Sequence, residues 1–318
     1  MTAGGRPVRV AVIGVGALGE HHARIYADLP GVRLAGVCDV DANRARAIAE
    51  RFGTSVFASL DEAAAGIDAA SVVVPTNRHF EVAAELLRRG IHLLIEKPIT
   101  STTEEAERLV ALADERGAIL QVGHIERFNP VLAFLERQPH PPRFIETHRL
   151  APYPPPRPDG RPRGTEVSVV LDLMIHDLEV ILHLVGAPVD RLDAVGVPVL
   201  SGSEDIANVR LRFANGAVAN VTASRISAER MRKIRVFYPD AYVSLDYMTQ
   251  AGALHRIGPS GIERIPVPIE RGEPLRHELR AFAECVARRA EPVVGGRQAA
   301  EALRLAVAAV RRMRESPS

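Results

Sequence analysis

The stretch of the sequence that most strongly suggests chemistry is a glycine-rich run near the N-terminus, Gly14-Val15-Gly16-Ala17-Leu18-Gly19. It follows an apolar segment and precedes a segment with helical spacing, the setting in which G-x-G-x-x-G binds a pyrophosphate. Glycines also occur in ordinary strand-to-helix turns, so the run alone is a weak signal. In a phosphate loop, Gly14 allows the tight turn, Gly16 a close approach of the backbone, and Gly19 close helix packing, while the helix amino terminus faces the phosphates. The cofactor contacts predicted here are Gly14, Gly16, Ala17, Leu18 and Gly19.

An acid follows at the expected distance. Asp39 lies 20 residues after Gly19, at the end of the next predicted strand, where a carboxylate binds ribose hydroxyls. A carboxylate repels a 2′-phosphate, and Val40 supplies no cation, so NAD is favoured over NADP. Arg44 and Arg46 are close enough in sequence to leave NADP as the alternative.

A lysine occurs where chemistry could use one. Lys97 and Lys233 are the two lysines of a chain that otherwise uses arginine, and Lys97 follows a predicted buried strand. Ligands of open α/β sheets bind at such strand ends. An ammonium can lose its proton when buried, whereas a guanidinium cannot. The alternative for Lys97 is a surface residue of a loop, and Lys233 is best explained by a solvated sheet face.

Four polar side chains share one face of an apolar helical segment, Val167–Val185. Asp172, His176, Glu179 and His183 follow one another at i, i+4, i+7 and i+11. An acid four residues before a histidine can fix its tautomer for general-base work. The alternatives are a polar stripe facing water and a metal site, which hydride-transfer chemistry does not need.

The elements that position these residues differ along the chain. Five short, β-branched runs alternate with four segments of helical spacing over the first ~120 residues, as in a doubly wound α/β domain with a parallel sheet. The strands are predicted at Val8–Ile13, Val32–Cys38, Ala69–Val74, His92–Ile95 and Ala118–Val122, and the helices at Ala17–Leu29, Asp41–Phe52, Asn77–Arg89 and Thr103–Arg116.

The pattern changes after Gly123. A helix is expected at Arg127–Gln138, a strand at Phe144–Leu150, and a proline-rich loop at Ala151–Glu166. Hairpin patterns follow, one of them around Asn215-Gly216, and two helices close the chain at about Pro274–Arg289 and Arg297–Met313. We therefore expect residues 1–123 to form a Rossmann domain, and residues 124–318 an α+β domain with an open, mainly antiparallel sheet.

Composition narrows the functional classes. The 318 residues carry 40 basic and 39 acidic side chains, a balance that gives no case for nucleic-acid binding. No apolar run is long enough to span a membrane. The run Val10–Gly19 after Arg6 and Arg9 imitates a secretory signal but lacks a cleavage site. With two cysteines besides, a cytoplasmic protein is expected.

Together these features resemble the Gfo/Idh/MocA family, the glucose–fructose oxidoreductase and inositol dehydrogenase group. The resemblance rests on the glycine-rich run, on Glu96-Lys97-Pro98, and on Asp172-Leu173-Met174-Ile175-His176-Asp177. It implies an NAD-dependent oxidoreductase whose catalytic group is Lys97, Asp172 and His176. The loop Val74–His79 resembles the family's loop beside the cofactor, which implies cofactor contacts at Pro75, Thr76, Asn77, His79, Glu96 and Lys97. An ordinary helix start, with Thr76 or Asn77 as its N-cap, is the alternative for this loop.

A second resemblance concerns the substrate. The segment Gly123–Pro130, with the arginine-rich loop that follows, looks like the branch of the family that oxidises the 3-hydroxyl of UDP-N-acetylglucosamine. Arg127, Arg157, Arg161 and Arg163 could make bidentate contacts with a diphosphate, or the last three could form a solvated loop. The substrate contacts implied are Lys97, His124, Arg127, Asn129, Arg163, Asp172 and His176.

Two other functions remain open. One is oxidation of a free polyol or sugar of the inositol or glucose type. The other is a non-catalytic NAD-binding sensor, which would need the glycines and Asp39 but not Lys97, Asp172 and His176. Because a single-layer sheet needs a cover for its second face, a homodimer or homotetramer is also expected.

Overall fold

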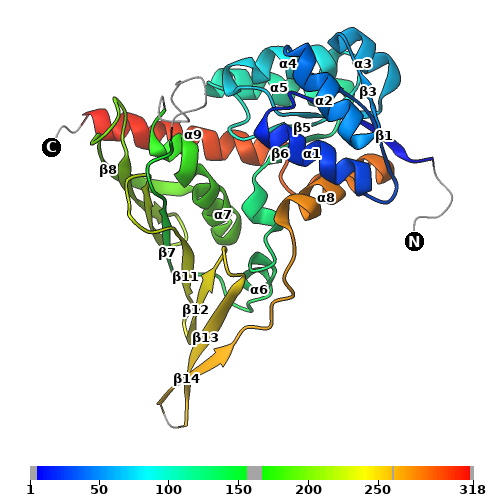
Figure 1. Cartoon of the computed structure of the whole chain (residues 1–318). Coiled ribbons are helices and arrows are strands. Elements are labelled where there is room, and N and C mark those ends of the chain that lie inside the picture. Colours follow the sequence, from blue (N-terminus) through cyan, green and yellow to red (C-terminus); the bar gives the residue numbers. More distant parts are fainter. Residues whose placement is uncertain (1–5, 156–166, 260, 316–318) are drawn as a thin grey trace. The chain divides into compact units, whose positions relative to one another are not determined.

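The structure, a computed structural model, describes residues 6–155, 167–259 and 261–315, and its elements are labelled in Figure 1. It divides into two compact units. The first comprises Met1–Ile125 with Glu273–Ala300, and the second Glu126–Gly272 with Glu301–Ser318. The chain therefore returns to the first unit after completing the sheet of the second.

The first unit contains a six-stranded parallel sheet of order β3-β2-β1-β4-β5-β6. Its strands are β1 (Val8–Ile13), β2 (Val32–Cys38), β3 (Ser55–Val56), β4 (Ala69–Val72), β5 (His92–Glu96) and β6 (Leu120–Gly123). The order reverses between β1 and β4, and ligands of doubly wound sheets bind at this point, beyond the carboxyl ends of the strands. The Rossmann fold predicted for the N-terminal part of the chain is thereby confirmed.

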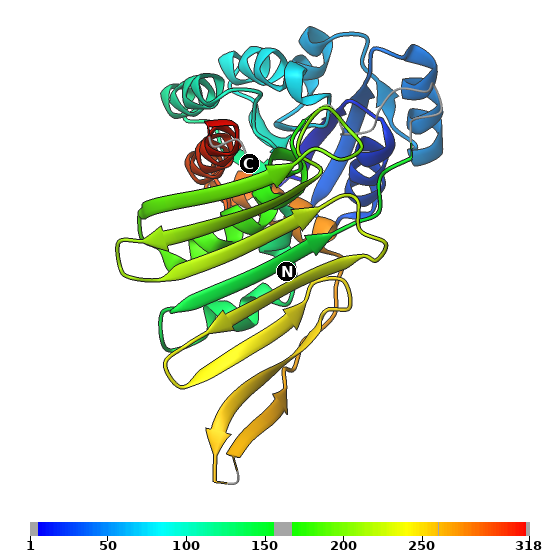
Figure 2. The same cartoon turned by 90° about the vertical axis from the view of Figure 1, so that its left-hand side faces the viewer.

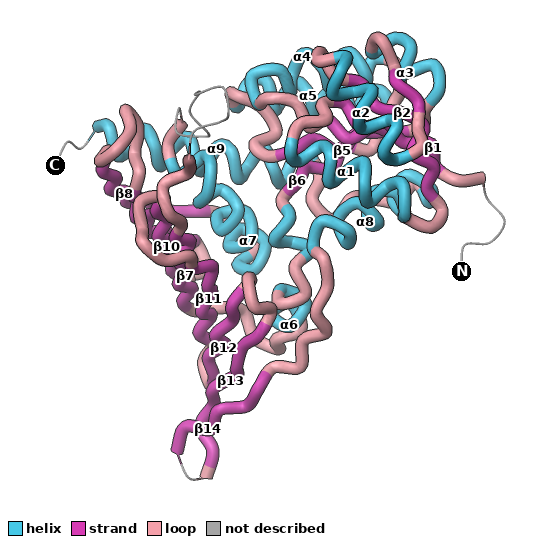
Figure 3. The backbone as a smooth tube through the Cα atoms, viewed as in Figure 1, coloured by secondary structure: helices cyan, strands magenta, loops and turns pink. Residues whose placement is uncertain are grey.

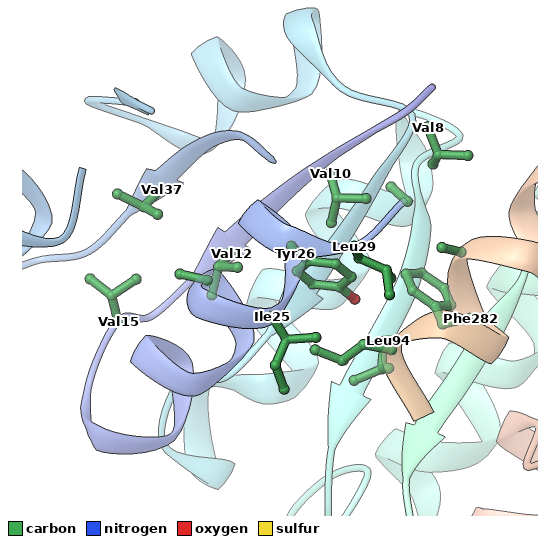
Figure 4. Close-up of a cluster of buried hydrophobic side chains, with 14 of the residues drawn as sticks. Val8, Val10, Val12, Val15, Ile25, Tyr26, Leu29, Val37, Leu94 and Phe282 are labelled. Carbon is green, nitrogen blue, oxygen red and sulfur yellow. The ribbon is translucent and has the colours of Figure 1, made fainter. Parts of the chain in front are cut away.

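Helices cover both faces of this sheet, as right-handed crossovers require. Their bounds are α1 (Ala17–Asp28), α2 (Ala42–Phe52), α3 (Leu60–Gly66), α4 (Thr76–Arg88), α5 (Thr103–Arg116) and α8 (Pro274–Arg288). α1 packs with α2 and α8, whereas α4 packs with α3 and α5. Figure 4 shows the core on the α1 side, where Ile25 and Tyr26 lie near Leu94 of β5 and Phe282 of α8. The apolar face of α8 thus completes the core of a domain formed far earlier in the sequence.

The second unit is built on an eight-stranded sheet of order β14-β13-β12-β11-β7-β10-β9-β8 (Figure 3). Its strands are β7 (Phe144–Leu150), β8 (Val189–Val197), β9 (Ile206–Phe213), β10 (Val218–Ser224), β11 (Met231–Phe237), β12 (Ala241–Asp246), β13 (Ala251–Gly258) and β14 (Gly261–Pro266). Every neighbouring pair is antiparallel except β7 and β10. The expected open, mainly antiparallel sheet is confirmed.

The helical part of the second unit departs from the prediction. The helix expected at Arg127–Gln138 is wrong: a 3₁₀ turn, Ile125–Phe128, ends before Pro130, and a short α6 follows at Leu132–Glu136. Pro130 lacks the backbone N–H that a continuous helix needs. The predicted helix over Val167–Val185 is a π-helical turn, Val170–Met174, leading into α7 (Ile175–Val185). α9 (Gly296–Glu315) closes the chain.

One face of the large sheet carries the packing of this unit. Along β7, Ile145, Thr147 and Arg149 are buried while the alternate residues are half-exposed, as the pleat requires. α7 and the π turn contact β10. In Figure 2 the face turned toward the viewer is crossed by no described helix.

Candidate functional site

The glycine-rich loop joins β1 to α1 in the geometry that a dinucleotide needs. Gly14 has φ +87°, and a Cβ there would lie 2.6 Å from the Val73 carbonyl oxygen of the neighbouring loop. A Cβ on Gly19 would lie 1.9 Å from the Gly14 oxygen. These two positions therefore exclude any side chain.

The start of α1 is suited to an anion. Gly16 is the N-cap, no side chain caps the first turn, and a Cβ at Gly16 would meet nothing within 4 Å. Ala17 and Leu18 are exposed. The first backbone N–H groups of the helix, with its positive dipole end, thus face open space, so the residues present fit a bound pyrophosphate.

Asp39 lies directly after β2, beside this loop. Its carboxylate accepts hydrogen bonds from the Val15 N–H, at 2.7 Å, and from the Asp41 N–H, at 2.8 Å. Arg44 lies 3.8 Å from the same carboxylate and 3.4 Å from that of Asp41. Two acids therefore offset the nearest cation, which supports the preference for NAD that Asp39 indicates.

The end of the β4–α4 loop and the first turn of α4 contain two kinds of residue. Pro75, Thr76 and Asn77 are exposed or half-exposed, and Pro75 is the N-cap of α4 without a side-chain hydrogen bond. The alternative of Thr76 or Asn77 as an ordinary N-cap is therefore wrong. The exposed residues are free to contact a ligand at the switch point of the sheet.

His79 is instead buried and joins two loops. Its Nδ1 lies 2.9 Å from the Pro98 carbonyl oxygen and its Nε2 lies 2.9 Å from the Val74 carbonyl oxygen. Burial lowers the pKa of His79, although both carbonyls favour its charged form. The ring therefore ties the segment before α4 to the turn that follows Lys97, and the predicted contact of His79 with the cofactor stays a prediction.

Lys97 lies in a turn at the end of β5. Glu96 is buried and Lys97 half-buried, the Lys97–Pro98 peptide is cis, and the Lys97 N–H donates to Glu96 Oε2 at 3.2 Å. The turn is thus held from both sides, by His79 on Pro98 and by Glu96 on Lys97. The strand-end position predicted for Lys97 is confirmed.

The polar face predicted on the helix of the second unit divides into two parts. Asp172 lies in the π turn and His176 in the first turn of α7, and both are half-buried. Glu179 is 2 % exposed and pairs with Arg127, whereas His183 pairs with Glu136 at 2.7 Å. π turns recur at functional sites in proteins. Glu179 and His183 are thus engaged in ion pairs within this unit, and the catalytic roles expected of Asp172 and His176 stay a prediction.

The remaining predicted substrate contacts are largely buried. His124 is buried after β6 in the first unit. Arg127 is 5 % exposed with Nη1 2.7 Å from Glu179, so a diphosphate contact would share this guanidinium with a carboxylate. Asn129 donates to Glu126 and to the Tyr247 carbonyl oxygen. Arg157, Arg161 and Arg163 lie outside the described residues.

A buried ion network, not expected from the sequence, fixes the helix that carries His176. Arg149 of β7 makes a bidentate pair with Asp177, with bonds of 2.7 and 3.0 Å, and a 2.9 Å bond to Glu126. Desolvation raises the pKa of Asp177 despite Arg149. Asp177 is adjacent to His176, so this network sets where the histidine lies. No spacing rule signals it, because its members are far apart in sequence.

Two further features of the described parts of the chain bear on function. No group of three or more histidine, cysteine or acidic side chains lies close enough there to hold a metal ion. No helix among the same residues has the length and apolar composition required to cross a membrane.

Comparisons with known proteins agree with this geometry. Residues 8–124 match the oxidoreductase family with an NAD-binding Rossmann fold, and residues 141–243 match the GFO/IDH/MocA C-terminal domain. The chain is 38% identical to the UDP-N-acetylglucosamine 3-dehydrogenase of Acidithiobacillus ferrooxidans over 95% of its own length and 97% of that protein's. A solved structure of that dehydrogenase aligns with a TM-score of 0.91, at 36% identity, covering 97% of this chain and 98% of the other. The scyllo-inositol 2-dehydrogenase (NAD(+)) of Bacillus subtilis is 29% identical over 69% of this chain and 68% of its own.

Proposed function

Because the chain belongs to the Gfo/Idh/MocA family of NAD-binding oxidoreductases, we propose that it oxidises the 3-hydroxyl of UDP-N-acetylglucosamine to the ketone. The observation that carries the substrate is the 38% identity, over 95% of the chain, to an enzyme of that name. The glycine-rich loop, Asp39, the exposed Pro75 and Asn77, and the half-exposed Thr76 would hold NAD, whose nicotinamide supplies the hydride acceptor when bound.

The catalytic roles are assigned by residue type. We propose that His176, oriented by Asp172, accepts the proton of the substrate hydroxyl. The Lys97 ammonium would donate a hydrogen bond to the oxygen as negative charge develops there. The half-buried positions of all three suit groups that must meet a substrate and still be shielded from bulk water.

The substrate pocket is proposed to draw on His124, Arg127, Asn129 and Arg163 as well. The Arg127 guanidinium would contact the substrate while it stays paired with Glu179. Asn129 would position the segment after Glu126 through its hydrogen bond to that carboxylate. In functional terms, residues 1–123 would bind the cofactor, and residues 124–318 the substrate and other subunits.

The turnover test compares substrates directly. Purified protein is incubated with NAD and UDP-N-acetylglucosamine, with glutamate and a sugar aminotransferase to remove the ketone, while NADH fluorescence is followed. Parallel samples contain inositol or glucose. Signal with the nucleotide sugar alone supports the proposal, and signal with a free polyol supports the second candidate, favoured by the inositol dehydrogenase relative. NAD binding without turnover on any sugar would revive the sensor alternative.

Association with a second copy is also proposed, through the uncovered face of the large sheet (Figure 2). Four rings from neighbouring strands form a ladder on this face, with centroid distances of 5.6, 5.1 and 4.3 Å. They belong to Phe144, Phe237, Tyr242 and His255. Aromatic side chains are enriched at interfaces. A homodimer or homotetramer is expected by light scattering at micromolar concentration, and Tyr242→Arg should dissociate it; a wild-type monomer would contradict the proposal.

We propose that the protein is cytoplasmic. Cys38 and Cys285 are both free thiols, which suits the reducing cytoplasm. Fractionation of producing cells, with the protein found outside the cytoplasmic fraction, would overturn this assignment.

A further inference from the structure

A buried carboxyl group lies in the first unit outside the residues assigned so far. Glu278 of α8 is 0% exposed, and neither of its carboxyl oxygens has a hydrogen-bond partner among the described residues. The neighbouring polar contact is to its backbone, where the Gln121 side chain donates to the Glu278 carbonyl oxygen at 3.3 Å. An ionised carboxylate in this position would lack the hydrogen bonds that buried charges require.

The surroundings of Glu278 add no compensating cation among the described residues. The charge that acts on it is that of Glu96 on β5, which is also negative. On α1, Tyr26 is fully buried, and its hydroxyl lies 2.9 Å from the Ser71 hydroxyl. His22, one turn earlier on α1, has Nε2 3.2 Å from Glu96 Oε1. β6 contributes the uncharged Gln121.

Apolar packing encloses this group. Leu279 and Phe282, which follow Glu278 on α8, are fully buried in the cluster that contains Tyr26 and Leu94 (Figure 4). In such an environment a carboxyl group takes up a proton, because desolvation and a like charge both disfavour the ionised form. Burial, reinforced by Glu96, raises the pKa of Glu278 well above its ordinary value.

Glu96 connects this group to the catalytic lysine. Its Oε2 accepts from the Lys97 N–H, while its Oε1 faces His22. Gly123 leaves the space for this carboxylate, since a Cβ there would lie 2.9 Å from Oε1. A second negative charge at Glu278 would repel the Glu96 carboxylate and so disturb the backbone of the Lys97 turn.

We propose that Glu278 remains a protonated carboxylic acid at neutral pH, and that it is a positioning residue whose neutral state keeps Glu96 and the Lys97 turn in place. Its effect on turnover rests on the proposed function, whereas its protonation does not. When alkaline pH removes this proton, the Lys97 turn loosens and activity falls.

Protonation is tested without substrate. Infrared spectra at pH 7.5 should show the C=O stretch of a carboxylic acid, distinct from that of carboxylates, and the difference between the wild-type and Glu278→Gln spectra should contain this band. Glu284→Gln, at an exposed site on the same helix, is the matched control and should leave the band. Absence of the band from the wild-type spectrum overturns the proposal even if the variant fails to fold.

Stability against pH gives a second readout. The unfolded chain releases the Glu278 proton above about pH 4.3, whereas the folded chain keeps it. Each pH unit above that value therefore lowers the folding equilibrium constant by about tenfold, up to the folded pKa. Glu278→Gln should remove this slope relative to wild type, and Glu284→Gln should not. An unchanged slope in Glu278→Gln overturns the proposal.

A third readout is the alkaline limb of the profile of kcat against pH. Glu278→Gln should keep the wild-type kcat near neutral pH and extend it to higher pH, while a merely structural role would lower kcat equally at every pH. An alkaline limb that stays unchanged in Glu278→Gln overturns the positioning role. If no sugar is turned over but the infrared band is present, the proposed function is contradicted, whereas the protonation of Glu278 is supported.

Discussion

The backbone N–H of Val15 donates a 2.7 Å hydrogen bond to the Asp39 carboxylate, which links the glycine-rich loop to the end of the neighbouring strand. A second bond, from the Asp41 N–H, leaves the carboxylate little freedom to rotate. One side chain thus shapes the glycine-rich loop and, in the proposed function, would also present the acceptor for ribose. Cofactor affinity and cofactor choice should therefore change together when it is altered.

Asp39→Ala is expected to raise the Kd for NAD roughly 10- to 100-fold, since hydrogen bonds to charged groups contribute about 1.5–3 kcal/mol. Without the carboxylate, Arg44 becomes available to a 2′-phosphate, so discrimination against NADP should narrow. Titration of both cofactors by fluorescence measures this. Asp41→Ala is the control: it removes the N-cap bonds to Asn43 and Arg44 and should lower stability with little change in NAD affinity.

Lys97→Met should lower kcat about 10²- to 10⁴-fold with a smaller effect on NAD binding, because it removes a hydrogen-bond donor from the developing alkoxide. Lys97→Arg keeps the charge but cannot release a proton. Recovery of much of the rate in Lys97→Arg would assign lysine an electrostatic role. Near-full turnover of folded Lys97→Met would contradict the assignment altogether.

His176→Gln is expected to reduce kcat by about 10²- to 10⁴-fold, as loss of a general base does. His183→Gln is the matched control on the same helix, because that histidine is bound to Glu136 at the exposed end. It should retain wild-type kcat. Equal losses in the two variants would show that the helix, and not the His176 imidazole, had been damaged.

His79 should make folding sensitive to acid. Burial lowers its pKa in the folded state, so as pH falls below about 6.5 the unfolded chain binds a proton that the folded chain does not. Stability is then lost by up to about 1.4 kcal/mol per pH unit. His79→Gln should reduce this slope in urea titrations and raise the KM for NAD, since it loosens the link between Val74 and Pro98. The slope of stability against pH that His79 contributes is opposite in sign to the one that Glu278 contributes. Each contribution is therefore measured as the difference in slope between the variant and wild type.

Arg149→Met should destabilise the protein by about 3–5 kcal/mol, because it leaves the buried Asp177 carboxylate without its bidentate partner and Glu126 with only the longer 3.7 Å contact to Arg232. Chemical denaturation measures the loss. Arg191→Met removes an exposed pair with Asp193 and should cost less than about 1 kcal/mol. Similar values for the two variants would mean that the buried network contributes little.

The sequence alone determined the features whose signals are local. β1 and β2 have the predicted bounds, and α5 spans the predicted Thr103–Arg116, between a Thr102 N-cap and Gly117. The glycine-rich loop, Asp39 and Lys97 each lie at a strand end that a short apolar run identifies. The strand Ser55–Val56 and the helix Leu60–Gly66 have no counterpart in the prediction. A two-residue exposed strand has no periodicity to detect, and a helix of seven residues has little more.

Tertiary structure decided what depends on contacts between distant residues. The spacing along Val167–Val185 predicts four equivalent side chains, yet Arg127, 52 residues before Glu179, pairs with one of them, and Glu136 binds another. Glu278 belongs by sequence to a helix near the C-terminus, and only the packing of α8 in the first unit buries its carboxyl group and exposes it to the charge of Glu96. Spacing reveals which residues share a face of one element. Which partner that face meets, and so whether its charges are paired or suppressed, is set by the long-range packing that buries it.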